Sequence, residues 1–162
     1  MTEIAERAGS SIGGLYRYFP DKKALALALR NRYNAEFEAL WASVIEESTH
    51  QSIADFAGDL VDRMAEFVAK RPAYFKLLAA PIQLQRDAAA RSQVRTQFSE
   101  VLLAKDRSLS HEKALLIARI AIQIINGMWA VYAEFEPRRR GSIVREFKRA
   151  LTAYLEDVLH SN

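Results

Sequence analysis

The sequence contains no cysteine, which excludes a disulfide framework and any metal site built from thiolates. Its three histidines, at positions 50, 111 and 160, are scattered along the chain. Glu47 and Asp157 each lie three residues before a histidine, as in di-iron helical bundles, but no facing mid-helix glutamates complete such a site. There is no serine–histidine–aspartate arrangement and no phosphate-binding glycine loop after a strand. We therefore expect a protein that is not an enzyme and that holds no metal and no cofactor.

The sequence also lacks a long run of residues without charge. Its longest stretch without charged residues, Ile120–Ala133, is shorter than the roughly 20 residues that a spanning helix needs, and it contains Gln123 and Asn126. Charged side chains near the N-terminus interrupt any apolar region of a secretory signal. We expect a soluble, cytoplasmic protein without a membrane partner.

The net charge is small, at +3, but it is unevenly distributed. Residues 1–35 hold six lysines and arginines against three acidic residues, whereas the remaining chain holds 17 of each. A positive field at one end of a neutral body favours an anionic partner at that end. The balanced body gives no indication of a strongly ionic ligand.

Helical periodicity dominates the sequence, and no alternating strand pattern, internal repeat or low-complexity tract is present. Asp21 and Ser110 are placed as N-caps of long apolar-periodic segments, and Pro137 precedes a predicted turn through Arg138–Gly141. Half of the 162 residues are apolar, which is enough to bury a core. We predict an all-α fold with helices over about residues 2–8, 12–19, 21–47, 53–68, 72–80, 83–104, 111–134 and 143–159.

The segment after the first predicted helix carries three of the six glycines of the chain. Gly9 falls at the C-terminus of helix 2–8, where the backbone turns left-handed and glycine adopts that conformation without strain. Ser10 and Ser11 are placed to cap the helix that follows. Ala5, a glycine four residues later and an apolar residue six further on have the spacing of a helix-turn-helix motif, whose second helix enters the DNA major groove.

Aromatic and basic side chains follow directly. Tyr16 and Tyr18 carry hydroxyls that can donate to phosphate oxygens, and Arg17 can reach a base edge or another phosphate. Lys22 and Lys23 fall in the first turn of the long helix, where the helix dipole and free N–H groups already favour an anion. The alternative interpretation is an ordinary helical hairpin with a solvated basic rim.

Residues 3–25, EIAERAGSSIGGLYRYFPDKKAL, resemble the DNA-binding helices of the tetracycline-repressor (TetR) family of bacterial transcriptional regulators. The family pattern is close to Ile-Ala-x-x-Ala-Gly, then Gly-Thr-Leu-Tyr-x-His/Tyr-Phe, then a lysine followed by a leucine. The matching positions here are Ile4, Ala5, Ala8, Gly9, Gly13, Leu15, Tyr16, Tyr18, Phe19, Lys22 and Leu25. The resemblance implies a regulator, usually a repressor, that releases DNA when a small molecule binds. It also implies a DNA-binding domain at residues 1–30 and a ligand-binding and dimerisation domain at residues 31–162.

The resemblance further implies which residues contact DNA. The positions that the family uses are Ile12, Gly13 and Arg17 for bases and Ser11, Tyr16, Tyr18 and Lys22 for phosphates. Gly14 also belongs to this predicted interface, although it replaces a usual threonine. That replacement removes a hydroxyl that often binds phosphate and weakens the helix by roughly 1 kcal/mol relative to alanine.

Family members carry a further helix before this motif, and the sequence as given begins inside the second helix of the pattern. Without that cover, we expect Ile4, Leu15 and Phe19 to be partly exposed, the first turns to be mobile and DNA binding to be weak. An alternative function is a dimeric small-molecule-binding module that does not bind DNA.

For the body of the chain, we predict a mostly apolar effector cavity with a few polar anchors. Aromatic residues more often simply fill a core, so the alternative for each of them is packing. The residues that we assign to the effector are Trp41, Phe67, Tyr74, Phe75, Phe98, Asn126 and Trp129.

The helix expected over 111–134 is apolar nearly all round, so we expect it to be buried on most sides. Arg119, Gln123 and Asn126 nevertheless share one stripe of it, and this stripe either lines the cavity or pairs across a subunit interface. The last two helices have apolar faces too broad for one bundle to cover, which predicts a homodimer through these helices. The predicted partners are therefore double-stranded operator DNA, a small-molecule effector and a second copy of the chain.

Overall fold

The structure of the chain is a computed structural model that describes residues 1–74, 77 and 88–160. Every regular element among these residues is a helix, which confirms the predicted all-α fold. The elements are α1 (Thr2–Arg7), α2 (Ile12–Tyr18), α3 (Lys22–Ser48), α4 (Ile53–Ala69), α6 (Ala88–Lys105), α7 (His111–Glu134), the 3-10 helix η1 (Pro137–Arg139) and α8 (Arg140–His160). Most of the helix predicted over 72–80 and the start predicted at 83 lie outside the described residues.

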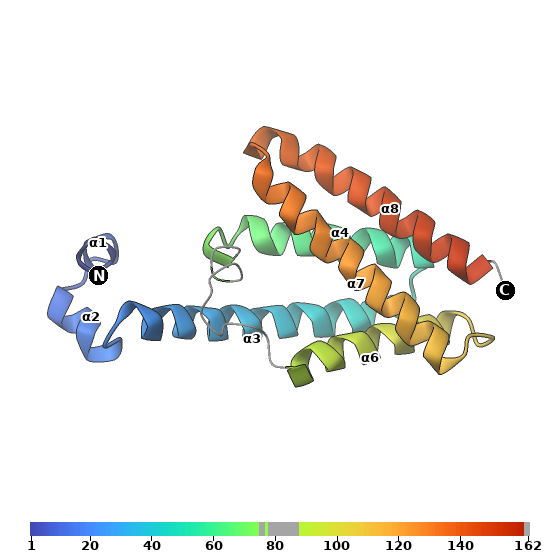
Figure 1. Cartoon of the computed structure of the whole chain (residues 1–162), viewed down its shortest axis with the longest axis horizontal. Coiled ribbons are helices and arrows are strands. Elements are labelled where there is room, and N and C mark those ends of the chain that lie inside the picture. The colour runs from blue at the N-terminus through green and yellow to red at the C-terminus, as the bar shows by residue number, and fades with distance from the viewer. Residues whose placement is uncertain (75–76, 78–87, 161–162) are drawn as a thin grey trace.

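The helices form a small head and a larger bundle that are joined by one long helix (Figure 1). Helices α1 and α2 make up the head, at the N-terminal end of α3 and away from the bundle. The C-terminal half of α3 lies beside α4 and α6, α7 packs against α6, and α8 packs against α4 and α7. The boundary that we predict between residues 30 and 31 falls inside α3, so head and bundle share this helix.

Side-chain caps fix the starts of α2, α3, α4 and α7. The capping oxygens belong to Ser11, Asp21, Ser52 and Ser110. In that order, they lie 3.0, 2.7, 3.1 and 3.2 Å from the backbone nitrogen three residues further along the chain. The caps predicted at Asp21 and Ser110 are therefore confirmed, and of the pair Ser10 and Ser11 it is Ser11 that forms the cap. The turn predicted through Gly141 is wrong at its end, because η1 already reverses the chain and α8 begins at Arg140.

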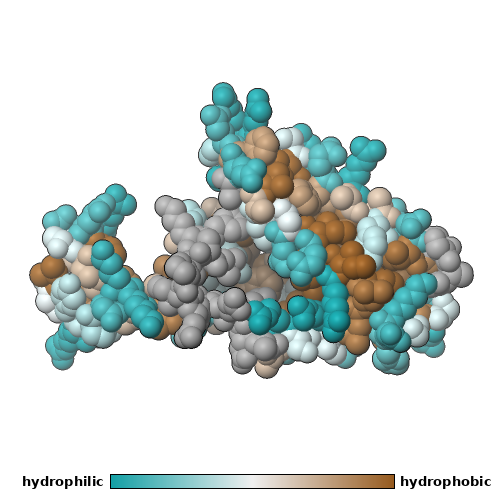
Figure 2. Space-filling view, in the orientation of Figure 1, coloured by the Kyte–Doolittle hydropathy of each residue, from teal (hydrophilic) through white to brown (hydrophobic). Residues whose placement is uncertain are grey.

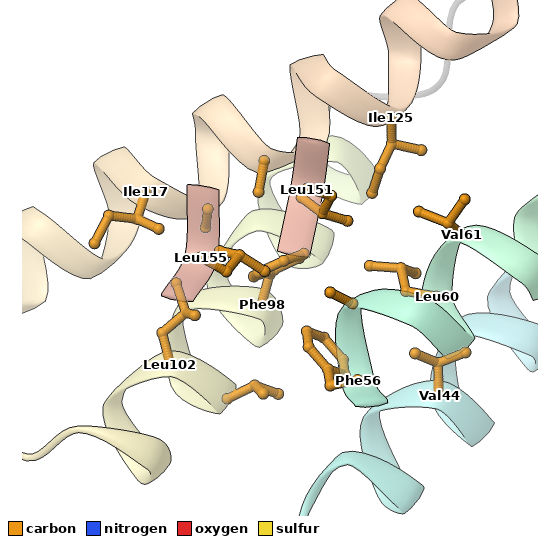
Figure 3. Close-up of a cluster of buried hydrophobic side chains, with 14 of the residues drawn as sticks. Val44, Phe56, Leu60, Val61, Phe98, Leu102, Ile117, Ile125, Leu151 and Leu155 are labelled. Carbon is orange, nitrogen blue, oxygen red and sulfur yellow. The ribbon is translucent and has the colours of Figure 1, made fainter. Parts of the chain in front are cut away.

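The core lies where the C-terminal half of α3 meets α4, α6, α7 and α8 (Figure 3). Phe56 and Phe98 are fully buried and meet edge to face, with ring centroids 5.4 Å apart. The other large side chains that are fully buried here are Leu60, Leu102, Met128, Leu151 and Leu155. Burial of a side chain of this size contributes roughly 1.5–3 kcal/mol relative to leaving it exposed. This core therefore holds together the bundle, to which the C-terminal half of α3 belongs.

Two clusters of ion pairs tie α3 to α4 and to the residues just beyond it. In the first cluster, Arg63 of α4 bonds with Glu47 of α3. In the second, the Glu36 carboxylate of α3 accepts from Arg32 at 2.8 Å and from Arg71, beyond the end of α4, at 2.6 Å. Because Glu47 and Glu36 belong to α3, protonation of these two carboxylates would loosen that helix from its neighbour.

We expect these clusters to make the stability of the protein fall in acid. Hydrogen bonds, first from Arg32 and then from Arg71, hold the pKa of Glu36 below its ordinary value of 4.5. A hydrogen bond from the Ser43 hydroxyl, and to a smaller extent one from Arg63 of α4, lowers the pKa of Glu47 in the same way. A carboxylate with a depressed pKa stabilises the fold above its unfolded pKa, and the contribution is lost as pH falls through the folded pKa. The melting temperature of the wild type should therefore fall more steeply below about pH 4.5 than that of Glu36→Gln/Glu47→Gln.

Thermal unfolding followed by circular dichroism between about pH 6 and pH 3 measures this difference. Glu46→Gln is the matched control, because Glu46 lies exposed on α3 without an ion-pair partner among the described residues. Parallel pH profiles for the wild type and the double variant would contradict the stabilising role of the two clusters.

Candidate nucleic-acid interface and effector cavity

Gly9 closes the turn between α1 and α2. Its φ of 61° lies in the left-handed region, which confirms the prediction for this position. The N–H of Gly9 donates to the carbonyl of Glu6 at 3.1 Å, and that of Ser10 donates to the carbonyl of Ala5 at 2.9 Å. These two bonds form a Schellman motif, which ends α1 and turns the chain into the cap of α2.

The two short helices of the head pack through small and apolar side chains. Ala5 is 2% exposed and Leu15 is 9% exposed, so the small Ala5 allows a close contact between α1 and α2. The expectation that Leu15 is partly exposed is therefore wrong, because α1 already covers it. Ile4, at 40% exposed, and the half-buried Phe19 are partly exposed as expected.

The large side chains predicted to contact DNA lie on the outer surface of the head. Tyr18 is 75% exposed, Tyr16 is 47% exposed and Ile12 is 45% exposed. Arg17 and Lys22 are exposed as well. None of the five is turned into the head, so all of them are free to meet an external surface.

The smaller residues of the predicted interface have different surroundings. Gly13 is exposed, and a Cβ at this position would meet no atom within 4 Å. A Cβ at Gly14 would lie 3.0 Å from Ser11 Oγ and 3.2 Å from Ser10 Oγ, so glycine leaves room for the cap. Ser11 Oγ accepts from the Gly14 N–H at 3.0 Å, which leaves the hydroxyl hydrogen for an external acceptor such as a phosphate.

The start of α3 adds positive charge beside α2. Lys22 and Lys23 are exposed in the first turn of α3, and no acidic side chain lies in the first turn of either α2 or α3. Asp21 is occupied as the N-cap, because its carboxylate accepts from the Ala24 N–H at 2.7 Å. The positive end of the helix dipole and the two ammonium groups therefore act together on any anion at this end of the molecule.

Alanine at the two exposed glycines of the head should have opposite effects. Gly9→Ala places a Cβ at a positive φ and is expected to destabilise the α1–α2 turn by roughly 1–2 kcal/mol. Gly13→Ala adds a side chain where space is open and is expected to stabilise α2 by up to about 1 kcal/mol. Amide hydrogen exchange of residues 1–20, followed by mass spectrometry, compares the variants. Faster exchange in Gly13→Ala than in Gly9→Ala would contradict this account of the turn.

A second candidate site is a cavity of about 150 Å³ between α3, α4, α6 and α7. The structure brings four of the predicted effector residues to its wall, namely Trp41, Tyr74, Asn126 and Trp129. None of the described side chains in this wall is charged, so an ionised group inside the cavity would find no partner there. The cavity therefore favours an apolar group, with the amide of Asn126 as a polar contact.

The other predicted effector residues lie elsewhere. Phe98 is fully buried in the core, and Phe67, at 4% exposed, packs edge to face against Tyr74 with ring centroids 5.2 Å apart. Neither belongs to the described wall of the cavity, and Phe75 lies outside the described residues. Their contact with an effector stays a prediction.

Phe37 also lines the cavity and is not among the effector residues predicted from the sequence. Its ring lies nearly parallel to that of Trp41, at an interplanar angle of 5° and a centroid distance of 6.5 Å. The sequence did carry a signal for Phe37, because it lies four residues before Trp41 and residues four apart on a helix share one face. Met64 and Ile125 also line the cavity, but nothing in the periodicity separates them from ordinary core residues.

Among the described residues, helix α7 packs mainly against α6 and α8. Leu116 is 57% exposed and Ile120 is 40% exposed, and Arg119 and Gln123 of the predicted polar stripe are exposed beside them. The expectation that this helix is buried on most sides is therefore wrong for the single chain. Figure 2 shows hydrophobic surface on the face that α7 crosses. By length and composition alone His111–Tyr132 could span a membrane, but the core helix of a soluble protein passes the same test.

Comparison with known families matches both parts of the molecule. Residues 1–29, the head and the start of α3, match the family model "Bacterial regulatory proteins, tetR family". Residues 52–155, most of the bundle, match the model "Tetracyclin repressor-like, C-terminal domain". The chain belongs to the TetR family. No curated protein matches the chain.

TetR-family proteins are ligand-responsive transcriptional regulators that bind DNA and have no enzymatic activity. The family assignment thus confirms the predicted class of protein, its helix-turn-helix and the expectation that it is not an enzyme. TetR-family members bind operator DNA and small-molecule effectors and form dimers, which gives the head, the cavity and the exposed side of α7 three separate candidate roles.

Proposed function

We propose that this TetR-family chain is a cytoplasmic repressor that a small, mostly apolar effector releases from its operator. The observation that carries the proposal is the continuity of α3 between the cavity and the head. Phe37 and Trp41 of α3 line the cavity, and Lys22 begins the same helix at the predicted DNA surface. At 1.5 Å per residue, the 27 residues of α3 span about 40 Å, so a small tilt at the cavity becomes a larger displacement of the head.

The far end of α3 is held more firmly than its head end. Lys105 of α6 donates to the carbonyls of Ser48 and Gln51 at 2.9 and 2.7 Å, and Arg63 bonds with Glu47, the residue before Ser48. An effector that presses on the aromatic side chains of α3 would therefore tilt the head about a fixed C-terminal end. The effector shifts the population toward the DNA-free arrangement only as far as it binds that arrangement more tightly.

The same proposal uses a homodimer through α7 and α8. Leu116 and Ile120 expose apolar side chains on α7, and the small residues Ala150 and Ala153 are exposed on α8. A two-fold interface between these faces would cover them in both copies. It would also present two recognition helices, each Ile12–Tyr18, to half-sites one helical turn apart, about 34–36 Å.

The second candidate function is a dimeric ligand-binding module that does not bind DNA. The exposure of Ile4, at 40%, favours it, because an apolar side chain of α1 is left uncovered beside the recognition helix. Weak DNA binding by the chain as given and mobility of its first turns stay predictions.

A selection from random-sequence DNA duplexes, carried out with the 162-residue chain at low salt, tests the repressor function. We expect enrichment of an inverted repeat whose half-site centres lie about 10 base pairs, or a multiple of that distance, apart. If no sequence is enriched while the chain still binds small apolar molecules, the second candidate function is the correct one.

Within the proposed interface, Arg17→Ala should have a sequence-dependent effect on DNA binding. We expect it to weaken binding to the selected duplex by about 1–3 kcal/mol and to relax the base preference at one position of each half-site. Arg7→Ala is the matched control, because it also removes one positive charge from the head. The side chain that it removes, however, pairs with Glu3 on α1 at 3.0 Å. Fluorescence anisotropy measures both affinities, and equal losses for the two variants would contradict base reading by Arg17.

A further inference from the structure

A second hollow adjoins the cavity on the side of α3 and α6. It is a surface cleft of about 190 Å³, and it shares Phe37, Trp41 and Val94 with the wall of the cavity. The cavity and the cleft are therefore neighbouring compartments, separated by the side chains of these three residues. A ligand longer than the cavity has the cleft as its nearest extension.

The two compartments differ in chemistry. The described wall of the cavity carries no charged side chain, whereas Glu38, Gln93 and Gln97 line the cleft. Glu38 is exposed and has no ion-pair partner among the described residues, and no basic side chain lines the described part of the cleft. An unpaired carboxylate beside two carboxamides favours a cationic group that also donates hydrogen bonds.

The size of the inner compartment limits what it can hold. A dry apolar cavity of about 150 Å³ accommodates a molecule the size of benzene, and the volume here is about 150 Å³. One aromatic ring or an alkyl group of similar size therefore fills it. The adjoining cleft offers space for the remaining atoms of a larger effector.

The wall between the compartments is aromatic and is held by one hydrogen bond. Trp41 Nε1 donates to Gln97 Oε1 at 2.9 Å, and the Trp41 ring lies nearly parallel to the Phe37 ring. A molecule that occupies both compartments must displace this indole or pass along its face. The ring faces also attract a cation that approaches from the cleft.

We infer that the effector is an elongated amphipathic amine, with one ring-sized apolar end in the cavity and a protonated amino group beside Glu38 in the cleft. The inference rests on the proposed function, in which this cavity is the effector site. Glu38 and Trp41 lie three residues apart on α3 and so share one face of the helix. Binding across the wall would act on α3 directly, because Phe37, Glu38 and Trp41 all belong to it.

Intrinsic fluorescence gives a direct test, because both tryptophans of the chain, Trp41 and Trp129, line the cavity. Trp129→Phe leaves Trp41 as the only emitter and keeps an aromatic side chain in the wall. This variant is titrated, without DNA, with phenylbutylamine, phenylbutanol and phenylbutyrate, which share one apolar end and differ in the charge of the other. We expect the amine to bind about fivefold more tightly than the alcohol, since the ion pair with Glu38 is partly exposed, and the carboxylate to bind most weakly.

The decisive variant is Glu38→Gln in the same background. It should bring the affinities of the amine and the alcohol to within about twofold of each other while leaving alcohol binding unchanged, which also shows that the variant is folded. Glu46→Gln, an exposed carboxylate further along α3, should preserve the fivefold preference. Equal binding of all three molecules, or a preference for the amine that survives Glu38→Gln, would overturn the inference.

Addition of phenylbutylamine to the complex with the selected duplex separates this inference from the proposed function. Binding to the free chain with release of DNA supports both. Binding to the free chain without release of DNA supports the amine site and contradicts its role as the effector site. A chain that binds DNA but shows no Trp41 response to the amine overturns the inference and leaves DNA binding intact.

Discussion

Replacement of Phe98 by alanine is expected to lower the free energy of unfolding by about 3–5 kcal/mol. Phe98 is 0% exposed and sits between two aromatic neighbours, with its ring centroid 5.4 Å from Phe56 and 6.1 Å from Trp41. Removal of its ring deletes the buried apolar surface and leaves a hole where α3, α4 and α6 meet. The closely packed surroundings can relax into such a hole only in part, which is why the cost exceeds that of lost burial alone.

Urea denaturation at one fixed protein concentration measures this loss, since the stability of a dimer depends on concentration. Phe135→Ala is the control with the same chemical change, because Phe135 is 37% exposed at the end of α7 and should cost less than about 1 kcal/mol. The loss at Phe98 should also alter the emission of its neighbour Trp41 in the folded protein. Similar losses for the two variants would show that Phe98 is not the central packing residue.

The case of Phe98 shows where sequence reasoning stops. Its type and helical position predict burial, but they do not say whether a buried aromatic fills the core or borders a cavity. Trp129, on another helix, has the same kind of sequence signal and does line the cavity. The difference depends on which side chains four separate helices bring together, and periodicity along one helix carries no such information.

Local features were predictable because their causes lie within a few residues. A glycine after an apolar helical turn predicts a left-handed C-terminus, and Gly9 adopts it. A serine or aspartate three residues before a helical N–H predicts a cap, and Asp21 and Ser110 form one. The dense helix-turn-helix pattern also predicted the exposed positions of Tyr16 and Tyr18, since outward side chains are what that motif presents.

Long-range polar contacts were not predictable in this way. The pairs Glu36–Arg71 and Lys148–Asp62 join residues 35 and 86 positions apart. Surface charges are numerous in any helical protein, so a sequence offers many equivalent partners for each one. Only the packing of α3 and α8 against α4 selects these two.

The exposed side of α7 leads to the second prediction with a large effect. Leu116→Glu/Ile120→Glu should convert the dimer that we propose through α7 and α8 into a monomer, because each two-fold interface would then bury four carboxylates in place of four apolar side chains. Both side chains are already exposed in the single chain, at 57% and 40%, so the substitutions should leave the fold of the monomer intact. Analytical ultracentrifugation measures the change in mass, and circular dichroism checks the helix content.

Loss of the dimer should also weaken operator binding by about 100-fold or more, because the second half-site is then no longer bound intramolecularly. Ser92→Glu/Thr96→Glu is the matched control: it places two glutamates at the same spacing on exposed positions of α6 and should leave both mass and operator affinity unchanged. A dimer that survives in Leu116→Glu/Ile120→Glu would place the interface elsewhere. A monomer that binds the operator as tightly as the wild type would instead show that one head is sufficient for recognition, and the role of symmetry in this regulator would have to be abandoned.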